Sequence, residues 1–185
     1  MFSTGAPQTR SEIIASLQRL YDESQQFLVT LTDAEFFMPQ GEKWSPAEQV
    51  RHLTKSVWPV AQALRLPRIA LALLFGCRRT ASRSFTEVET FYQDKLKTGV
   101  TAGRFAPSPQ SAPEDPRARR TEIMQYWHDA HRKLVQAIAA WPEAALDHYR
   151  LPHPALGKLT LREMFFFTLY HNAHHVRQIH ARRTH

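Results

Sequence analysis

The chain has 185 residues and a mass of 21.4 kDa, a length that suits one domain. Hydrophobic residues make up 43% and charged residues 22%, which excludes the disordered, collagen-like and low-complexity classes. The single cysteine, Cys77, excludes an internal disulfide framework and a cysteine-built zinc finger, and we expect it to be a small buried hydrophobe. The net charge of +7 permits nucleic acid, anionic membranes or acidic small molecules as partners.

No segment is typical of a signal peptide or of a membrane-spanning helix. The first ten residues lack an apolar core, and the most hydrophobic run, residues 69–77, is too short to cross a bilayer. Four arginines flank this run: Arg65, Arg68, Arg78 and Arg79. They are compatible with an interfacial anchor, but we expect the run to form a buried helix edge or a dimer contact. The sequence therefore predicts a cytoplasmic protein without membrane contact.

The first half of the chain shows helical periodicity. Apolar residues recur at helical spacing over residues 8–31, and residues 32–44 form a connector. Ser45, Pro46 and Glu48 form a capping box with proline at the first helical position, which starts a second helix that ends before Pro67. Short helices are predicted over 69–76 and 85–97.

The second half begins with an irregular segment rich in proline and glycine, residues 98–117, whose length is typical of a mobile segment or a lid. A helix is predicted over 117–140, a turn-rich connector over 148–159, and a last helix over 161–182 that starts at a capping box of Thr160 and Glu163. The sequence thus predicts one all-α domain over residues 1–185, a four-helix bundle. The alternative is an α protein whose middle third is irregular.

The histidines of the last helix are the first candidates for chemistry. His171 and His175 are four residues apart, so their side chains lie one turn apart on one face. On a helical wheel His175 falls inside the apolar stripe and His171 at its edge, whereas His174 and His180 fall outside it. Two inward imidazoles need polar partners, which a metal ion, a water or a carboxylate network would supply.

A third ligand could come from the second helix. His52 lies about two turns after the Ser45 cap, where it is either a boundary histidine packed beside Leu53 or a ligand that reaches across to the last helix. Three histidines and one open position are the arrangement expected of a catalytic zinc-type site. The sequence does not show that the two helices are adjacent.

Other polar residues are weaker candidates. His128 and His131 could form a second pair, but a surface or packing role is expected. His153 lies between prolines in a loop, and Glu48 and Glu163 have a sufficient role in their capping boxes.

Three segments resemble the DinB-like, or YfiT-type, superfamily of bacterial proteins: WSPAEQVRHL at 44–53, LPHPALGKLT at 151–160 and HNAHHVRQI at 171–179. The resemblance implies an antiparallel four-helix bundle with long crossover connections, and it is weakest over residues 68–117. It also implies a divalent metal ion such as Zn, Ni, Fe or Mn, held by His52, His171 and His175. Similar proteins often form homodimers, and some use a low-molecular-weight thiol as cosubstrate.

These features favour a metal-dependent enzyme that acts on a small-molecule substrate. A three-histidine site would activate a water or a thiol for attack on an electrophile, as in a hydrolase or a thiol S-transferase. The alternative is a non-enzymatic metal-binding or stress-response interaction module, which would have a closed site or no adjacent pocket. No specific nucleic-acid binding is expected, because the arginine pairs are scattered and match no recognised motif.

Overall fold

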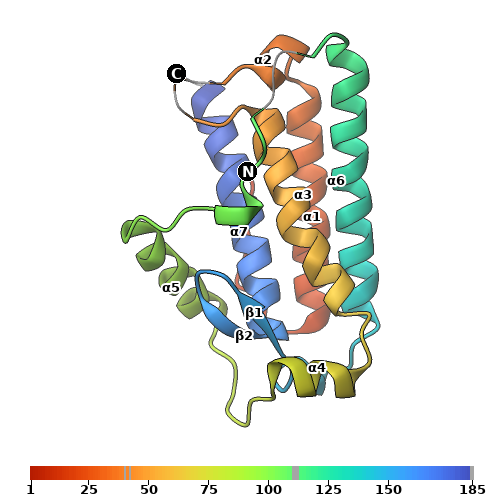
Figure 1. Ribbon diagram of the computed structural model, residues 1–185, viewed down its shortest axis with the longest axis vertical. Helices are drawn as coiled ribbons and strands as arrows, with labels where there is room; N and C mark the ends of the chain where they lie inside the picture. The colour runs from red at the N-terminus through yellow and green to blue at the C-terminus, as the bar shows by residue number, and fades with distance from the viewer. Residues whose placement is uncertain (40, 42, 110–112, 184–185) are drawn as a thin grey trace.

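Four long helices form the body of the molecule (Figure 1). The computed structural model describes residues 1–39, 41, 43–109 and 113–183. Helix α1 packs against α6 and α7, and α3 packs against the same two helices, so α1 and α3 face each other diagonally. The predicted all-α four-helix bundle is confirmed. Its helices are α1 (Arg10–Val29), α3 (Pro46–Ala63), α6 (Pro116–Ala139) and α7 (Leu161–Arg183).

Two of the helices run in each direction (Figure 1). The ends of α1 and α7 lie together, because Arg183 donates to the hydroxyl of Thr30, so these neighbours are parallel. The ends of α3 and α6 also lie together, because the indole N–H of Trp141 donates to the carbonyl of Leu64. Since α3 and α6 are parallel, their connection must return along the bundle. This long crossover contains α4 (Arg68–Phe75), α5 (Phe85–Lys97) and the 3-10 turn η1 (Gly103–Phe105).

Most of the helices begin at side-chain caps that the sequence already shows. Ser45 and Glu48 form the predicted capping box of α3, with Pro46 in the first turn. The cap satisfies backbone N–H groups that have no partner inside the helix, and so fixes where the helix begins. The same reciprocal box starts α1 at Thr9, α2 (Asp33–Phe37) at Thr32 and α5 at Ser84.

Two connectors hold more regular structure than expected. The predicted connector 32–44 contains α2, and the predicted turn-rich connector 148–159 contains a hairpin of β1 (Arg150–His153) and β2 (Gly157–Thr160), after the short turn η2 (Glu143–Ala145). The strands are antiparallel, with Leu151 opposite Leu159. Their four-residue length and the proline in β1 hide the pattern of alternating residues that indicates a strand.

Residues 69–77 do not form the buried helix edge that was one of the two expectations for this run, whereas the other, a dimer contact, stays a prediction. Helix α4 lies across one end of the bundle (Figure 1). Its side chains Ile69, Leu73 and Leu74 are exposed, and so is Cys77 after it. Hydrophobicity favours burial but does not say against what a segment packs. Among the described residues no single helix is long and apolar enough to cross a bilayer, and only the pair α3 and α4, bent by 113°, meets that test together.

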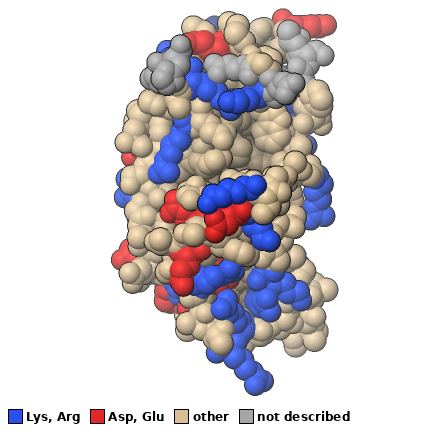
Figure 2. Space-filling model, turned by 90° about the vertical axis from the view of Figure 1, so that its left-hand side faces the viewer, with Lys and Arg blue, Asp and Glu red and all other residues tan. Residues whose placement is uncertain are grey.

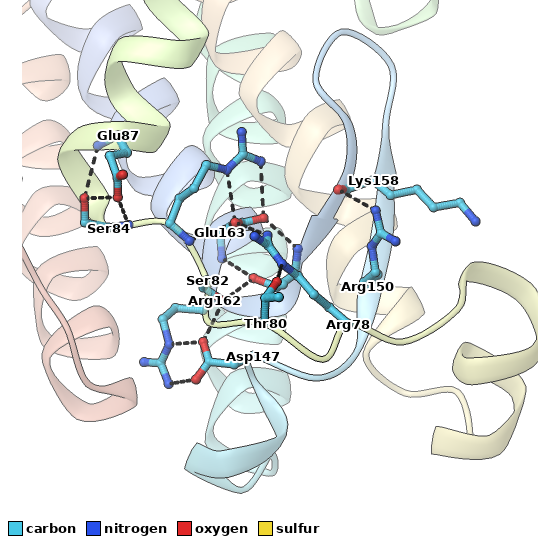
Figure 3. Close-up of polar contacts among 12 residues, drawn as sticks. Arg78, Thr80, Ser82, Ser84, Glu87, Asp147, Arg150, Lys158, Arg162 and Glu163 are labelled. Carbon is cyan, nitrogen blue, oxygen red and sulfur yellow. Dashed lines mark hydrogen bonds and ion pairs between the residues drawn. The ribbon is translucent and has the colours of Figure 1, made fainter.

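A buried carboxylate ties the crossover to the start of α7 (Figure 3). Glu163 is completely buried, and its Oε1 accepts from Arg78 at 2.8 Å and from the side chain of Arg83 at 3.0 Å. Its Oε2 accepts from the backbone N–H of Thr160, which completes the second predicted capping box. These bonds fix the helix on which His171 and His175 lie.

Candidate metal centre

The structure brings the three predicted histidines together between α3 and α7. His52 Nε2 lies 3.0 Å from His171 Nε2, and one ring nitrogen of each of the three histidines lies within 4.8 Å of the others. Ligand nitrogens in a tetrahedral site with Zn–N bonds of about 2.0–2.1 Å are about 3.3 Å apart. The donor set and its spacing therefore fit a divalent metal ion.

Burial makes these imidazoles neutral. His52, His171 and His175 are only 4%, 5% and 8% exposed. Loss of solvation lowers the pKa of His171 and His175 well below the usual 6.5, and the neighbouring imidazoles lower it further. Burial lowers the pKa of His52 too. At neutral pH each ring thus has a lone pair for a metal ion, since protonated imidazole cannot be a ligand.

Hydrogen bonds at the outer nitrogens orient two of the rings. His52 Nδ1–H donates to the backbone carbonyl of Phe105 at 2.9 Å, which leaves Nε2 unprotonated. His175 Nδ1 lies 3.1 Å from the buried side-chain amide of Gln49. If the Gln49 carbonyl accepts from Nδ1–H, Nε2 of His175 is free to bind a metal, whereas the opposite amide orientation would put the proton on Nε2.

The segment predicted to be mobile or to form a lid supplies one of these bonds. Phe105 lies in η1, inside the predicted irregular segment 98–117, and Lys55 on α3 donates to the carbonyl of the next residue, Ala106. Residues 110–112 of that segment lie outside the described residues. The described part therefore holds His52 in place, in addition to covering the site.

The three histidines line a cavity of about 360 Å³ between α3, α5, α7, the hairpin and η1. This volume falls in the range of small-molecule pockets, roughly 300–1,000 Å³. The walls are mostly apolar and aromatic, and among the described lining residues Arg104 is the one side chain with a permanent charge. Trp44 packs beside His52 at a ring-centroid distance of 5.1 Å, and Phe167 stacks on His171 at the same distance. The three-histidine cluster is thus open on its cavity side.

A fourth histidine, His153, lines the cavity, although its place between prolines in the sequence indicates no role. Nδ1 of His153 accepts from the backbone N–H groups of Ala155 at 3.2 Å and Leu156 at 3.0 Å. Because Nδ1 is an acceptor, the proton of the neutral ring is on Nε2. Burial lowers the pKa of His153 to about 4. The hairpin therefore presents a neutral N–H donor at the cavity. The sequence does not show this donor, because the backbone N–H groups that fix the tautomer of His153 come together only in the hairpin turn.

The other candidate histidines, His174, His128 and His131, do not belong to the three-histidine cluster. His174 lies outside the three-histidine cluster, as the wheel predicts, but it lines the cavity and accepts from Gln178. His128 and His131 lie on α6, away from the cavity, against Tyr21 of α1. The predicted packing role suits this second pair, because His131 stacks on the Tyr21 ring at 4.3 Å.

The neutral histidines predict a pH effect on the metal-free protein. Burial lowers the pKa of His131 and His153 to about 4, whereas the unfolded chain binds these protons near pH 6.5. The unfolded state is therefore favoured as the pH falls from 7.5 to 5, and we expect Tm to drop by roughly 5 °C or more. Thermal unfolding followed by circular dichroism in the presence of a chelator measures this. A constant or rising Tm over this range would contradict it, since buried carboxylates respond only at lower pH.

Comparisons with known proteins agree with the four-helix fold. The model of the DinB superfamily matches residues 16–179. TT2238, a four-helix bundle protein of known structure, superimposes with a TM-score of 0.57 at 15% identity, over 94% of this chain and 99% of that one. YfiT from Bacillus subtilis, described as a probable metal-dependent hydrolase with an unusual four-helix bundle topology, gives 0.57 at 13% identity, over 95% and 87%.

A search of the curated proteins found no match. The two structural similarities establish the shared fold, and the family model covers most of the chain. The chain therefore belongs to the DinB superfamily.

Proposed function

We propose that this protein is a metal-dependent enzyme, a hydrolase or a thiol S-transferase, that acts on a small electrophilic molecule. One observation carries the proposal: three buried histidines with converging nitrogens line a cavity large enough for a small molecule. A purely structural metal site would be closed by a fourth protein ligand. The description of YfiT as a probable metal-dependent hydrolase supports the hydrolase arm.

The residues of the cavity have separate roles in this proposal. His52, His171 and His175 would hold a divalent ion such as Zn, Ni, Fe or Mn. Such an ion supplies a Lewis acid that lowers the pKa of a water or thiol to near neutrality. The apolar walls exclude bulk water, which strengthens polar interactions inside the site.

His153 and Arg104 would position the substrate. The Nε2–H of His153 remains a neutral donor across the physiological range, so it can stabilise negative charge that develops on a substrate oxygen. Tyr92 lines the same cavity, and burial raises its pKa to about 12, so it also stays protonated. Arg104 offers a positive charge to an anionic substrate group or thiol cosubstrate. The homodimer and the cytoplasmic location stay predictions of the sequence.

The test is an activity screen on untagged protein whose metal content has been measured. We expect the metal-loaded protein to hydrolyse activated esters or amides, or to replace the halide of an aryl halide by a low-molecular-weight thiol with release of halide ion and a proton. A chelator should remove this activity and added metal should restore it. His153→Gln should keep the metal but lower kcat by on the order of 100-fold, as expected for loss of one oxyanion donor. His128→Gln is the matched control, because it is exposed and remote from the cavity.

Two outcomes would contradict the proposal. Bound metal without activity on either substrate class would favour the non-enzymatic metal-binding module. Activity that survives complete metal removal would separate the reaction from the three-histidine site.

A further inference from the structure

Helix α4 presents an apolar surface that the described part of the chain does not cover. Leu66 is 40% exposed, Ile69 72%, Leu73 82% and Leu74 62%, and we call these four residues the α4 face. Only Leu71 of this helix is buried. The helix lies across the end of the bundle after a bend of 113° from α3 (Figure 1). Large side chains exposed together in this way mark an interaction site more often than scattered ones do.

The chain on both sides of α4 carries positive charges and no acidic residue. Between Lys55 and Glu87 the chain has five arginines and no Asp or Glu. Figure 2 shows Lys and Arg side chains gathered at the lower end of the molecule, where α4 lies in Figure 1. The arginines next to the α4 face along the chain are Arg65, Arg68, Arg78 and Arg79.

Nearby carboxylates compensate only part of this positive charge. Glu163 is shared by Arg78 and Arg83, and Glu143 and Asp147 both pair with Arg162. Among the described residues, Arg65 and Arg79 form no ion pair. An apolar surface flanked by free arginines has the chemistry of a helix that lies in a bilayer interface, where anionic headgroups meet the guanidinium groups.

We propose that the α4 face docks onto an anionic lipid surface. A second copy of the chain is the other occupant to consider, but a two-fold contact would bring the same arginines of both copies together. Like charges at such a contact oppose association, whereas anionic headgroups attract them. The expectation of no membrane contact treated this run as a buried helix edge or a dimer contact, and the exposure of Ile69, Leu73 and Leu74 removes the first of these reasons.

Docking at this face would place the cavity close to the lipid. Phe75, the last residue of α4, lines the cavity together with Leu151 and Pro152 of the hairpin that packs on α4. An apolar substrate dissolved in the bilayer would therefore have a short path to the cavity. The docking itself does not depend on the proposed enzymatic activity.

The experiment is co-sedimentation of the full chain with unilamellar vesicles. We expect binding to vesicles that contain phosphatidylglycerol and little binding to pure phosphatidylcholine, with affinity that falls as salt rises. Ile69→Ser/Leu73→Ser should weaken binding by on the order of tenfold or more, because both side chains would enter the interface. Arg65→Gln/Arg79→Gln should weaken it by on the order of tenfold.

The matched control is Val29→Ser/Tyr126→Ser, which removes two other exposed apolar side chains and should bind as the parent does. Unchanged circular dichroism confirms that each variant folds. Absence of binding to anionic vesicles, or equal binding by Ile69→Ser/Leu73→Ser, overturns the proposal. The proposal is also overturned if the parent is a dimer, Ile69→Ser/Leu73→Ser is a monomer, and neither binds vesicles. That result would assign the α4 face to a contact between two copies of the chain.

Discussion

Replacing His171 and His175 by alanine together is expected to lower the metal content from about one equivalent per chain to nearly zero. The double variant leaves His52 as the single member of the cluster, and one imidazole holds a divalent ion weakly. Mass spectrometry of metals on untagged protein, before and after reloading with Zn, Ni or Mn, measures the change. Added metal at 100 times the Kd should raise the free energy of unfolding of the parent by about 2.7 kcal/mol, and so raise its Tm. The Tm of the variant should stay unchanged.

His174→Ala is the matched control for this variant. His174 lies on the same turn of α7 and lines the same cavity, but it is not a member of the three-histidine cluster. We expect it to keep the full metal content. Equal loss in both variants would mean that metal binding reflects general histidine content, and metal retained by the double variant would place the ion elsewhere.

The sequence predicts local features of this protein well, because they depend on near neighbours in the chain. The caps at Ser45 and Thr160 locate two helix starts, and the four-residue spacing of His171 and His175 puts both on one face. The meeting of His52 with this pair depends on the packing of α3 against α7. Only the resemblance to a known family pointed to that contact before the structure showed it.

Two features that the sequence did not predict, the tautomer of His153 and the exposure of α4, depend on how the backbone folds around them. His153 has prolines on both sides, and its tautomer is set by backbone N–H groups that converge only in the hairpin turn. The exposure of α4 depends on the bend after α3, which no periodicity in residues 69–77 reveals. In both cases the residue types can be read from the sequence, but the residues that surround them in the fold cannot.

The buried carboxylate of Glu163 leads to the prediction with the largest effect on stability. Burial alone would raise its pKa, but hydrogen bonds from Arg83 and Thr160 outweigh burial and hold the pKa below the usual value. Glu163→Gln would leave Arg78 and Arg83 facing an uncharged amide inside the structure (Figure 3). Because both arginines are partly exposed, we expect a loss of about 3 kcal/mol, at the lower end for a broken buried pair, and a Tm lower by roughly 5–10 °C.

Glu87→Gln separates the ion pairs from the helix cap. Glu87 has the same capping-box position on α5, but it is exposed and forms no ion pair among the described residues. Its replacement should cost less than about 1 kcal/mol. Equal losses in the two variants would assign the role of Glu163 to capping alone. A larger loss for Glu163→Gln that disappears as the pH falls well below 4.5, where both parent carboxylates become protonated, would assign it to the charged pairs that join the crossover to α7.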